Sequence, residues 1–245
     1  MKKLLMFLSI VAVSCSSGKD FKKSPVDVLI RDMDKTESFS IILYDMDVTG
    51  TFVRTYQHQY KVVTLNKDTP EEKITDWMEV SEEFFRMNEN NMGMEIAAKS
   101  ADGKITKTAS PPGYSNYVGN AQYGQWRDNG SGGSFWEFYG KYAMMSTMFN
   151  MMASPINRGY YNDYRSNYYG RQAYYGPKSS DGSTTYGTQS AFARKTSGNS
   201  RWTARTASRS SASSSSSWSS RTSRSSSRYT GSSGGFRSRG GGFGK

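Results

Sequence analysis

The chain has 245 residues and a formal net charge of +11, with one cysteine, one histidine, 24 glycines and 17 tyrosines. A single thiol excludes a disulfide framework within the chain and a cysteine-based zinc site. The charge is uneven, because residues 20–110 hold 17 Asp/Glu and 12 Lys/Arg, whereas residues 111–245 hold 17 Lys/Arg and four acids.

Residues 1–14 have the pattern of a secretory signal peptide. Two lysines precede an apolar run over 4–13, and small residues lie directly before Cys15. The run would extend about 15 Å as a helix, against roughly 30 Å of hydrocarbon, which argues against a membrane span. A cysteine at this place resembles the lipobox of bacterial lipoproteins, in which the thiol is acylated and becomes the mature N-terminus. The alternative is an ordinary signal peptide in which Cys15 has no role.

A polar tether is expected over 15–23, and residues 24–110 then carry the pattern of one small folded domain. Ser24-Pro25 is typical of a helix start, and apolar residues at i, i+3, i+4 and i+7 predict a helix that ends near Lys35. Two strands joined by a Thr-Gly turn are expected next, over 38–48 and 52–65.

The rest of this domain is predicted from turn and capping residues. In chain order, we expect a polar loop over 66–72, a strand or helix opening over 73–80, a short helix capped by Ser81, and strands over 94–99 and 105–108 around Asp102-Gly103. The predicted fold class is α+β, with an antiparallel sheet and helices on one of its faces. A core this small, braced by no disulfide, predicts modest stability.

A Gly/Tyr-rich linker is expected over 111–134, followed by a Met/aromatic-rich helix over 135–153 that includes a Glu137–Lys141 ion pair. Two uses of this helix stay open: it lies in the membrane interface, or it packs on the folded domain or a partner. Its candidate contact residues are Phe135, Trp136, Phe138, Tyr139, Met144, Met148 and Phe149.

Residues 154–245 predict a disordered basic tail. From residue 160 onward there is no Leu, Ile, Val or Met, so little apolar surface is available to offset the entropy of ordering the chain. We expect the tail to contact anionic glycans or lipids; the alternatives are an exported nucleic-acid-binding tail or a spacer without a ligand. The arginines assigned to this contact are Arg201, Arg205, Arg209, Arg221, Arg224, Arg228, Arg237 and Arg239.

Candidate catalytic and metal-binding residues are few. His58 is expected to be a half-buried strand residue, since no Ser/His/Asp or Cys/His arrangement is established around it. The pairs Asp32/Asp34 and Asp45/Asp47 are too sparse for a calcium loop. We therefore expect no enzyme activity and no cofactor, with an unrecognised site in 24–110 as the remaining enzyme alternative.

The C-terminal half resembles a known family. Three segments are similar in order and composition to those of the YgiB-type envelope lipoproteins. They are Gly132-Gly133-Ser134-Phe135-Trp136, then Tyr169-Gly170 to Tyr186-Gly187, then Arg239-Gly240-Gly241-Gly242-Phe243-Gly244. The resemblance covers the signal and roughly 130–245, does not extend to 20–110, and brings no catalytic residue. It implies a lipid-anchored protein of the bacterial cell envelope with a structural or interaction role, and we expect an envelope protein as a further partner. Ser16 after the cysteine favours the outer membrane.

Overall fold

The computed structural model describes residues 24–151, 155–180, 182–196, 200 and 202. It has the α+β architecture predicted, built on an antiparallel sheet of six strands. The strands follow the order β3-β2-β1-β5-β6, and β4 pairs with β2 beyond the end of β3. Their bounds are β1 Ser38–Thr49, β2 Thr55–Asn66, β3 Thr69–Ile74, β4 Met78–Val80, β5 Glu95–Lys99 and β6 Ile105–Thr106.

The long β1–β2 hairpin confirms the two strands predicted first, with β2 beginning at Thr55 instead of 52. Its register runs from Ser38 opposite Leu65 to Thr49 opposite Thr55. The turn needs Gly50, which has φ +84° and would bring a Cβ within 2.0 Å of the Val53 carbonyl oxygen. Only glycine adopts this conformation at low cost, so the turn conformation depends on the sequence at this one position.

The polar loop expected over 66–72 is wrong, because β3 begins within it. Lys67 and Asp68 both have positive φ, 47° and 68°, and form a two-residue turn that leads directly into β3. Pro70 pairs opposite Leu65. A proline is tolerated there because β3 is an edge strand with one side free of pairing.

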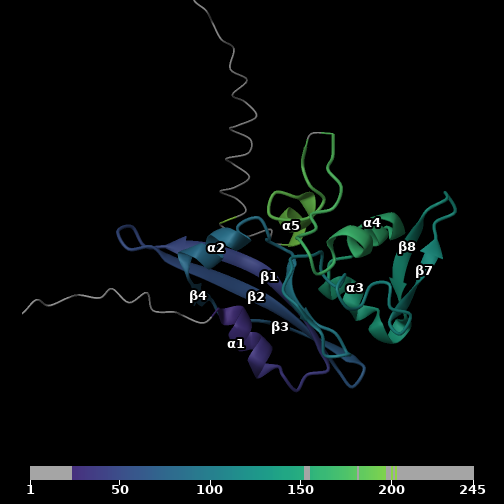
Figure 1. Ribbon diagram of the computed structural model, residues 1–245, viewed down its shortest axis with the longest axis horizontal. Coiled ribbons are helices and arrows are strands. Elements are labelled where there is room, and N and C mark those ends of the chain that lie inside the picture. Colours follow the sequence, from purple (N-terminus) through teal and green to yellow (C-terminus); the bar gives the residue numbers. More distant parts are fainter. Residues whose placement is uncertain (1–23, 152–154, 181, 197–199, 201, 203–245) are drawn as a thin grey trace, which may run out of the picture.

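Two helices cover one face of the sheet, α1 (Pro25–Asp32) and α2 (Glu82–Asn88), as predicted (Figure 1). The backbone N–H of Phe84 donates to Ser81 Oγ at 3.1 Å, which caps α2. The core on this face joins helix and strand side chains; its buried members are Val26, Phe39, Ile41, Leu43, Met46, Tyr60, Val62, Val80, Phe85, Met92, Ile96 and Ala97.

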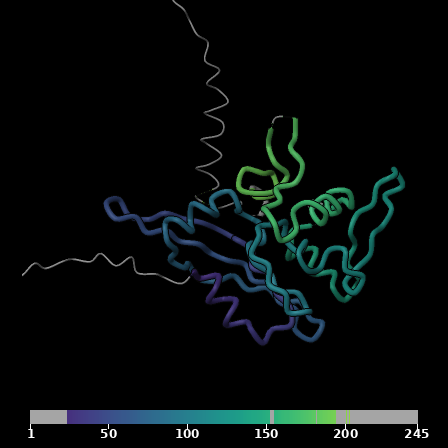
Figure 2. The backbone as a smooth tube through the Cα atoms, viewed as in Figure 1, coloured from purple at the N-terminus to yellow at the C-terminus, as the bar shows by residue number. Residues whose placement is uncertain are grey.

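The other face of the sheet is also covered, by the chain after residue 110. Ile42, Val63 and Leu65 point from the sheet into a second core of tyrosines and methionines. Figures 1 and 2 show this second layer, in teal to green, to the right of the sheet. Its elements are β7 Gly124–Asp128, β8 Ser134–Phe138, η1 Gly140–Tyr142, α3 Met144–Met148, α4 Arg158–Asp163, η2 Tyr164–Tyr168 and α5 Ala191–Thr196. The sheet is therefore buried on both faces. The chain after residue 110 packs against the sheet, so the expected domain boundary at 110 does not separate two cores.

The helix predicted over 135–153 is wrong. Its first part is strand β8, in which Trp136 and Phe138 are buried on one face with a period of two, and its second part is the short α3. Glu137 pairs with Arg127 at 3.1 Å and not with Lys141, which instead reaches Asp68 at 3.1 Å. Within the described part of the chain, no helix has the length and apolarity that a membrane crossing requires.

The linker expected over 111–134 and the disorder expected from 154 are also corrected for the described residues. Tyr114, Tyr117 and Tyr123 are buried in the second core, although they come from the expected linker. Residues 155–180 and 182–196 carry helical segments and bury Tyr164, Tyr174, Tyr186 and Phe192. The physical reason is that aromatic rings supply the apolar area that aliphatic side chains supply elsewhere.

Candidate functional site

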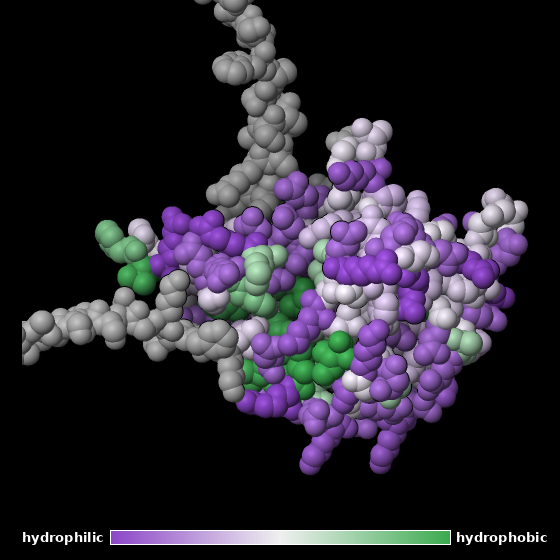
Figure 3. Space-filling view, viewed as in Figure 1, coloured by the Kyte–Doolittle hydropathy of each residue, from purple (hydrophilic) through white to green (hydrophobic). Residues whose placement is uncertain are grey.

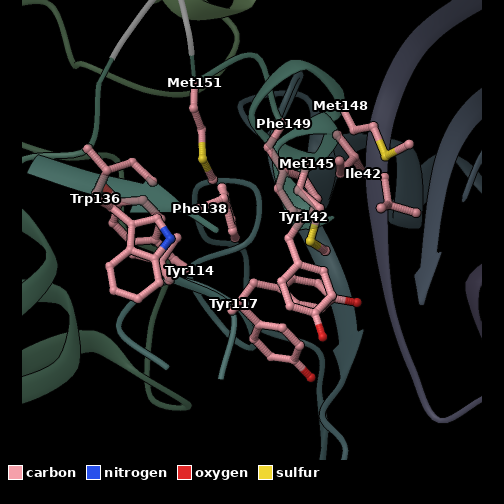
Figure 4. Close-up of a cluster of buried hydrophobic side chains, with 14 of the residues drawn as sticks. Ile42, Tyr114, Tyr117, Trp136, Phe138, Tyr142, Met145, Met148, Phe149 and Met151 are labelled. Atoms are coloured by element: carbon pink, nitrogen blue, oxygen red, sulfur yellow. The ribbon is translucent and has the colours of Figure 1, made fainter. Parts of the chain in front are cut away.

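The residues predicted to act in function separate into two groups. Cys15, the signal peptide and the arginines from Arg201 to Arg239 lie outside the described residues. The seven side chains of the expected membrane helix share no common surface: Trp136, Phe138, Met148 and Phe149 are buried, and Phe135 is half-buried. Only Tyr139, 40% exposed, and Met144, 62% exposed, face outward. Figure 4 shows that the residues of this segment line the second core, which removes the interfacial-helix hypothesis.

A cavity with polar lining lies between the β5–β6 turn and the second layer. It has a volume of about 480 Å³, and we call it the tyrosine cavity. Three segments form it: the β5–β6 turn, the stretch 115–123, and the chain around α4 and η2. Its lining residues are Ser100, Ala101, Asp102, Ser115, Asn116, Val118, Gly119, Asn120, Tyr123, Tyr161, Arg165 and Tyr169.

One wall is the β5–β6 turn, which confirms the predicted Asp-Gly hairpin. Ser100 Oγ donates to the Asp102 carboxylate, and the backbone N–H of Lys104 donates to the same carboxylate at 3.2 Å. The Ser100 hydroxyl is the main cause that lowers the pKa of Asp102, followed by the Lys104 N–H. The wall therefore presents a fixed, ionised carboxylate.

The side of the cavity formed by η2 and Tyr169 is aromatic and cationic, and the β5–β6 turn reaches it through Lys104. The guanidinium of Arg165 lies 4.1 Å from the ring centroid of Tyr169, and Lys104 Nζ lies 4.7 Å from the same centroid. Both distances fall within the range of cation–π attraction, so the Tyr169 ring holds two cations, of which Arg165 lines the cavity. Arg165 remains exposed to solvent.

Tyr161, on α4, reaches across the cavity to Gly119. Gly119 has φ +76°, and a Cβ built there would lie 2.4 Å from the Tyr161 hydroxyl oxygen. Tyr161 also lies 5.7 Å from the ring of Tyr114 in the second core. A glycine is therefore required both by the backbone conformation and by the close approach of the tyrosine.

The floor of the cavity is tied to a buried carboxylate. Ser115 Oγ lies 3.1 Å from Ser110 Oγ and 3.2 Å from the Tyr164 hydroxyl. Ser110 Oγ donates to Glu95 at 3.3 Å. The Gly113 N–H donates to Glu95 at 3.1 Å, and the Ser40 hydroxyl also donates to it.

Glu95 is fully enclosed, and burial is the main cause that raises its pKa, against the opposing effect of these donors. Its partners come from β1, from residues 110–115 and, through Ser115, from η2. The hydrogen-bond network therefore fixes the cavity floor to the sheet. Its role is to hold Ser115 and Tyr164 in place and not to supply a reactive group.

The asparagines of the cavity differ in what they offer a ligand. The Asn116 amide donates to the carbonyl oxygens of Phe39, at 3.1 Å, and Lys99, at 2.8 Å, so this side chain is already engaged in holding the sheet. Asn120 is exposed and accepts from the Gln122 N–H at 3.0 Å. Ring faces, a carboxylate and the Asn120 amide suit non-covalent binding of a hydroxyl-rich ligand, and the two cations on Tyr169 would attract a negative charge on that ligand.

His58 does not line the tyrosine cavity, and its environment is that of a core residue. It is fully buried on β2, not half-buried as expected, with Nδ1 3.0 Å from the Tyr60 hydroxyl and its ring against Phe84 and Phe85. Burial lowers the pKa of His58 to about 3. The imidazole is therefore neutral and enclosed by aromatic rings, as a core residue is. In the part of the chain that the structure describes, no group of three or more His, Cys, Asp or Glu side chains has a metal-binding arrangement.

Sequence reasoning missed the tyrosine cavity, although one signal was present. Tyr161, Tyr164 and Tyr168 recur at i, i+3 and i+7, which is a helical period. Helix α4 and the η2 turn occupy these positions and place Tyr164 in the core.

Comparison of the chain with protein-family models, with curated proteins and with solved structures gives no match. No relative therefore supplies a function or a site residue.

Proposed function

We propose that this chain is a lipid-anchored protein of the bacterial cell envelope that binds an anionic saccharide polymer. Acylated Cys15 holds it to the membrane, the tyrosine cavity binds a sugar-and-phosphate segment of the polymer, and the basic residues beyond Arg201 add non-specific attraction. The role is one of interaction and structure, with no chemical step.

The pair of cations on the Tyr169 ring is the observation that carries this proposal. Lys104 and Arg165 come from segments 61 residues apart in number, yet both lie within 5 Å of one ring centroid. Arg165 and Tyr169 line a cavity of about 480 Å³ that offers ring faces to sugars, and Lys104 lies against the same Tyr169 ring. A phosphate or carboxylate at the mouth would gain charge-assisted hydrogen bonds from both side chains.

The location rests on the sequence of the first 15 residues and on the resemblance of the C-terminal half to YgiB-type lipoproteins. An exported basic protein meets lipid phosphates and charged glycans more readily than it meets nucleic acid. Attraction of this kind is independent of ligand sequence and is screened by salt.

Binding of purified lipopolysaccharide to the full mature chain tests the proposal. We expect Lys104→Gln and Arg165→Gln each to weaken binding about tenfold, because a hydrogen bond to a charged group is worth roughly 1.5–3 kcal/mol. Arg171→Gln is the matched control: Arg171 is exposed and is not one of the two cations on the Tyr169 ring, so this variant removes one charge elsewhere.

Three outcomes would count against the proposal. Equal losses in all three variants would mean that net charge alone drives binding. Equal affinity for neutral dextran would show that Lys104 and Arg165 do not contribute to binding through their charge. Tighter binding to single-stranded nucleic acid, with a steep salt dependence, would favour the nucleic-acid alternative instead.

A further inference from the structure

The tip of the β1–β2 hairpin carries two large apolar side chains that are mostly exposed. Phe52 is 100% exposed and Val53 is 82% exposed, and Arg54 follows them directly. Figure 3 shows apolar colour at the left end of the described residues, where the hairpin of β1 and β2 projects beyond the sheet. Exposed apolar groups in such a position mark a surface that meets a partner or a membrane.

The tip is a defined shape and not an extended loop. Thr49 pairs with Thr55, so only residues 50–54 lie outside the ladder. Gly50, at φ +84°, turns the chain so closely that a Cβ there would lie 2.0 Å from the Val53 carbonyl oxygen. Phe52 and Val53 are therefore held at the end of a stiff two-stranded arm.

We propose that this tip inserts into the lipid bilayer surface to which the chain is anchored. Two side chains cover far less than the roughly 800 Å² per partner that a stable protein interface needs, whereas an interfacial insertion needs only a small apolar wedge. Arg54 suits the same depth, because its long stem lies along apolar surface while the guanidinium stays at lipid phosphates.

The position of the anchor favours a bilayer as the occupant, and in this respect the inference rests on the proposed function. Residues 15–24 span at most about 30 Å when fully extended, so chain length limits an anchor at Cys15 to within that distance of the start of α1. Val26, at that start, packs in one cluster with Val80 of β4. Strand β4 in turn pairs with Tyr56 to His58, the part of β2 that directly follows the tip. The start of α1 and the hairpin tip therefore lie at the same end of the molecule.

Fluorescence of an environment-sensitive label at Thr51→Cys tests the insertion. The full acylated chain is reconstituted in phosphatidylcholine vesicles, which avoid attraction of the basic tail, and quenching by spin-labelled lipid is measured. The matched control carries the label at Ser131→Cys, in the exposed β7–β8 turn. We expect quenching at position 51 and none at 131.

A second arm uses the chain from residue 15 onward with Cys15→Ala, which lacks the acyl group. In this background Phe52→Ser combined with Val53→Ser should lower vesicle binding about tenfold, a ratio that corresponds to about 1.4 kcal/mol. Because both side chains are exposed, the thermal unfolding midpoint should not change, which separates lost insertion from lost folding.

The outcomes distinguish the two proposals. An acylated chain that floats with vesicles while position 51 stays as unquenched as 131 overturns the insertion and leaves the anchor standing. A chain that is not acylated in cells, yet is quenched at 51, overturns the anchor and leaves the insertion standing. Absence of quenching at position 51 in both the acylated and the non-acylated chain overturns the insertion.

Discussion

At the scale of single residues, His58 makes stability depend on pH. Burial lowers its pKa from 6.5 to about 3, so below pH 6.5 the unfolded chain takes up a proton that the folded chain refuses. The free energy of unfolding then falls by about 1.4 kcal/mol per pH unit until the pH nears the folded pKa. This contribution is complete above pH 6.5 and is lost as the pH falls.

We therefore predict that His58→Phe flattens the acid limb of the stability curve. Between pH 7 and 4.5 the wild type should lose about 2 to 3 kcal/mol more than the variant, measured by urea unfolding at both pH values. The variant loses the contact with the Tyr60 hydroxyl at both pH values alike, so the difference between pH values isolates the imidazole. Parallel losses in the two proteins would contradict the assignment.

Gly119 is the second residue with an individual consequence. We predict that Gly119→Ala weakens lipopolysaccharide binding about tenfold, because the new methyl group occupies the place of the Tyr161 hydroxyl and displaces that side chain. Gly130→Ala is the matched control, since Gly130 has a similar φ of +72° and no atom lies within 4 Å of its built Cβ. If both variants bind equally well, Tyr161 does not shape the cavity.

At the scale of elements, the tyrosine layer determines whether the chain after 110 is folded. Tyr114 is at its centre: its hydroxyl lies 3.1 Å from that of Tyr186, and its ring contacts Tyr161, Tyr164 and Tyr174. We predict that Tyr114→Ala lowers the free energy of unfolding by about 3–5 kcal/mol, and Tyr114→Phe by about 1 kcal/mol.

Near-ultraviolet circular dichroism and urea unfolding check this prediction together. The alanine variant should lose most of the tyrosine signal, whereas the phenylalanine variant keeps it. An alanine variant with the wild-type signal and midpoint would mean that residues 155–196 contribute no packing, as first expected from their composition.

The elements also show which parts of the fold are readable from sequence. The β1–β2 hairpin, α2 and the β5–β6 turn were predictable because alternation, a Ser cap and Asp-Gly act locally. The segment 135–153 was mispredicted because aromatic residues at 135, 136, 138 and 139 hide the period of two, which shows only in the burial of Trp136 and Phe138. The tyrosine cavity was not predictable from composition, since Lys104 and Tyr169 meet only through the tertiary fold.

At the scale of the whole molecule, the described chain ends on the helix face of the sheet. The ring of Trp202 lies 5.1 Å from that of Phe85 on α2, and the Ser200 hydroxyl donates to Asp45 on β1. Trp202 therefore lies on the face of the sheet that is opposite the tyrosine layer.

We predict that truncation after residue 202 leaves the thermal midpoint unchanged, whereas truncation after 196 lowers it by about 2–4 °C, the shift expected for a loss of about 1 kcal/mol. The first truncation should also reduce the salt dependence of lipopolysaccharide binding, because it removes arginines that act through charge alone. Identical midpoints for both truncations would show that the contact of Trp202 with Phe85 does not stabilise the fold.

Acylation of Cys15 is the central claim about this protein, and palmitate labelling of cells that express the wild type or Cys15→Ala tests it most directly. We predict that the wild type takes up label, is processed in a globomycin-sensitive step and stays with the membrane, and that Cys15→Ala does none of these. Mature protein that is soluble in the cytosol with its first residues intact, or identical processing of both chains, would contradict the claim.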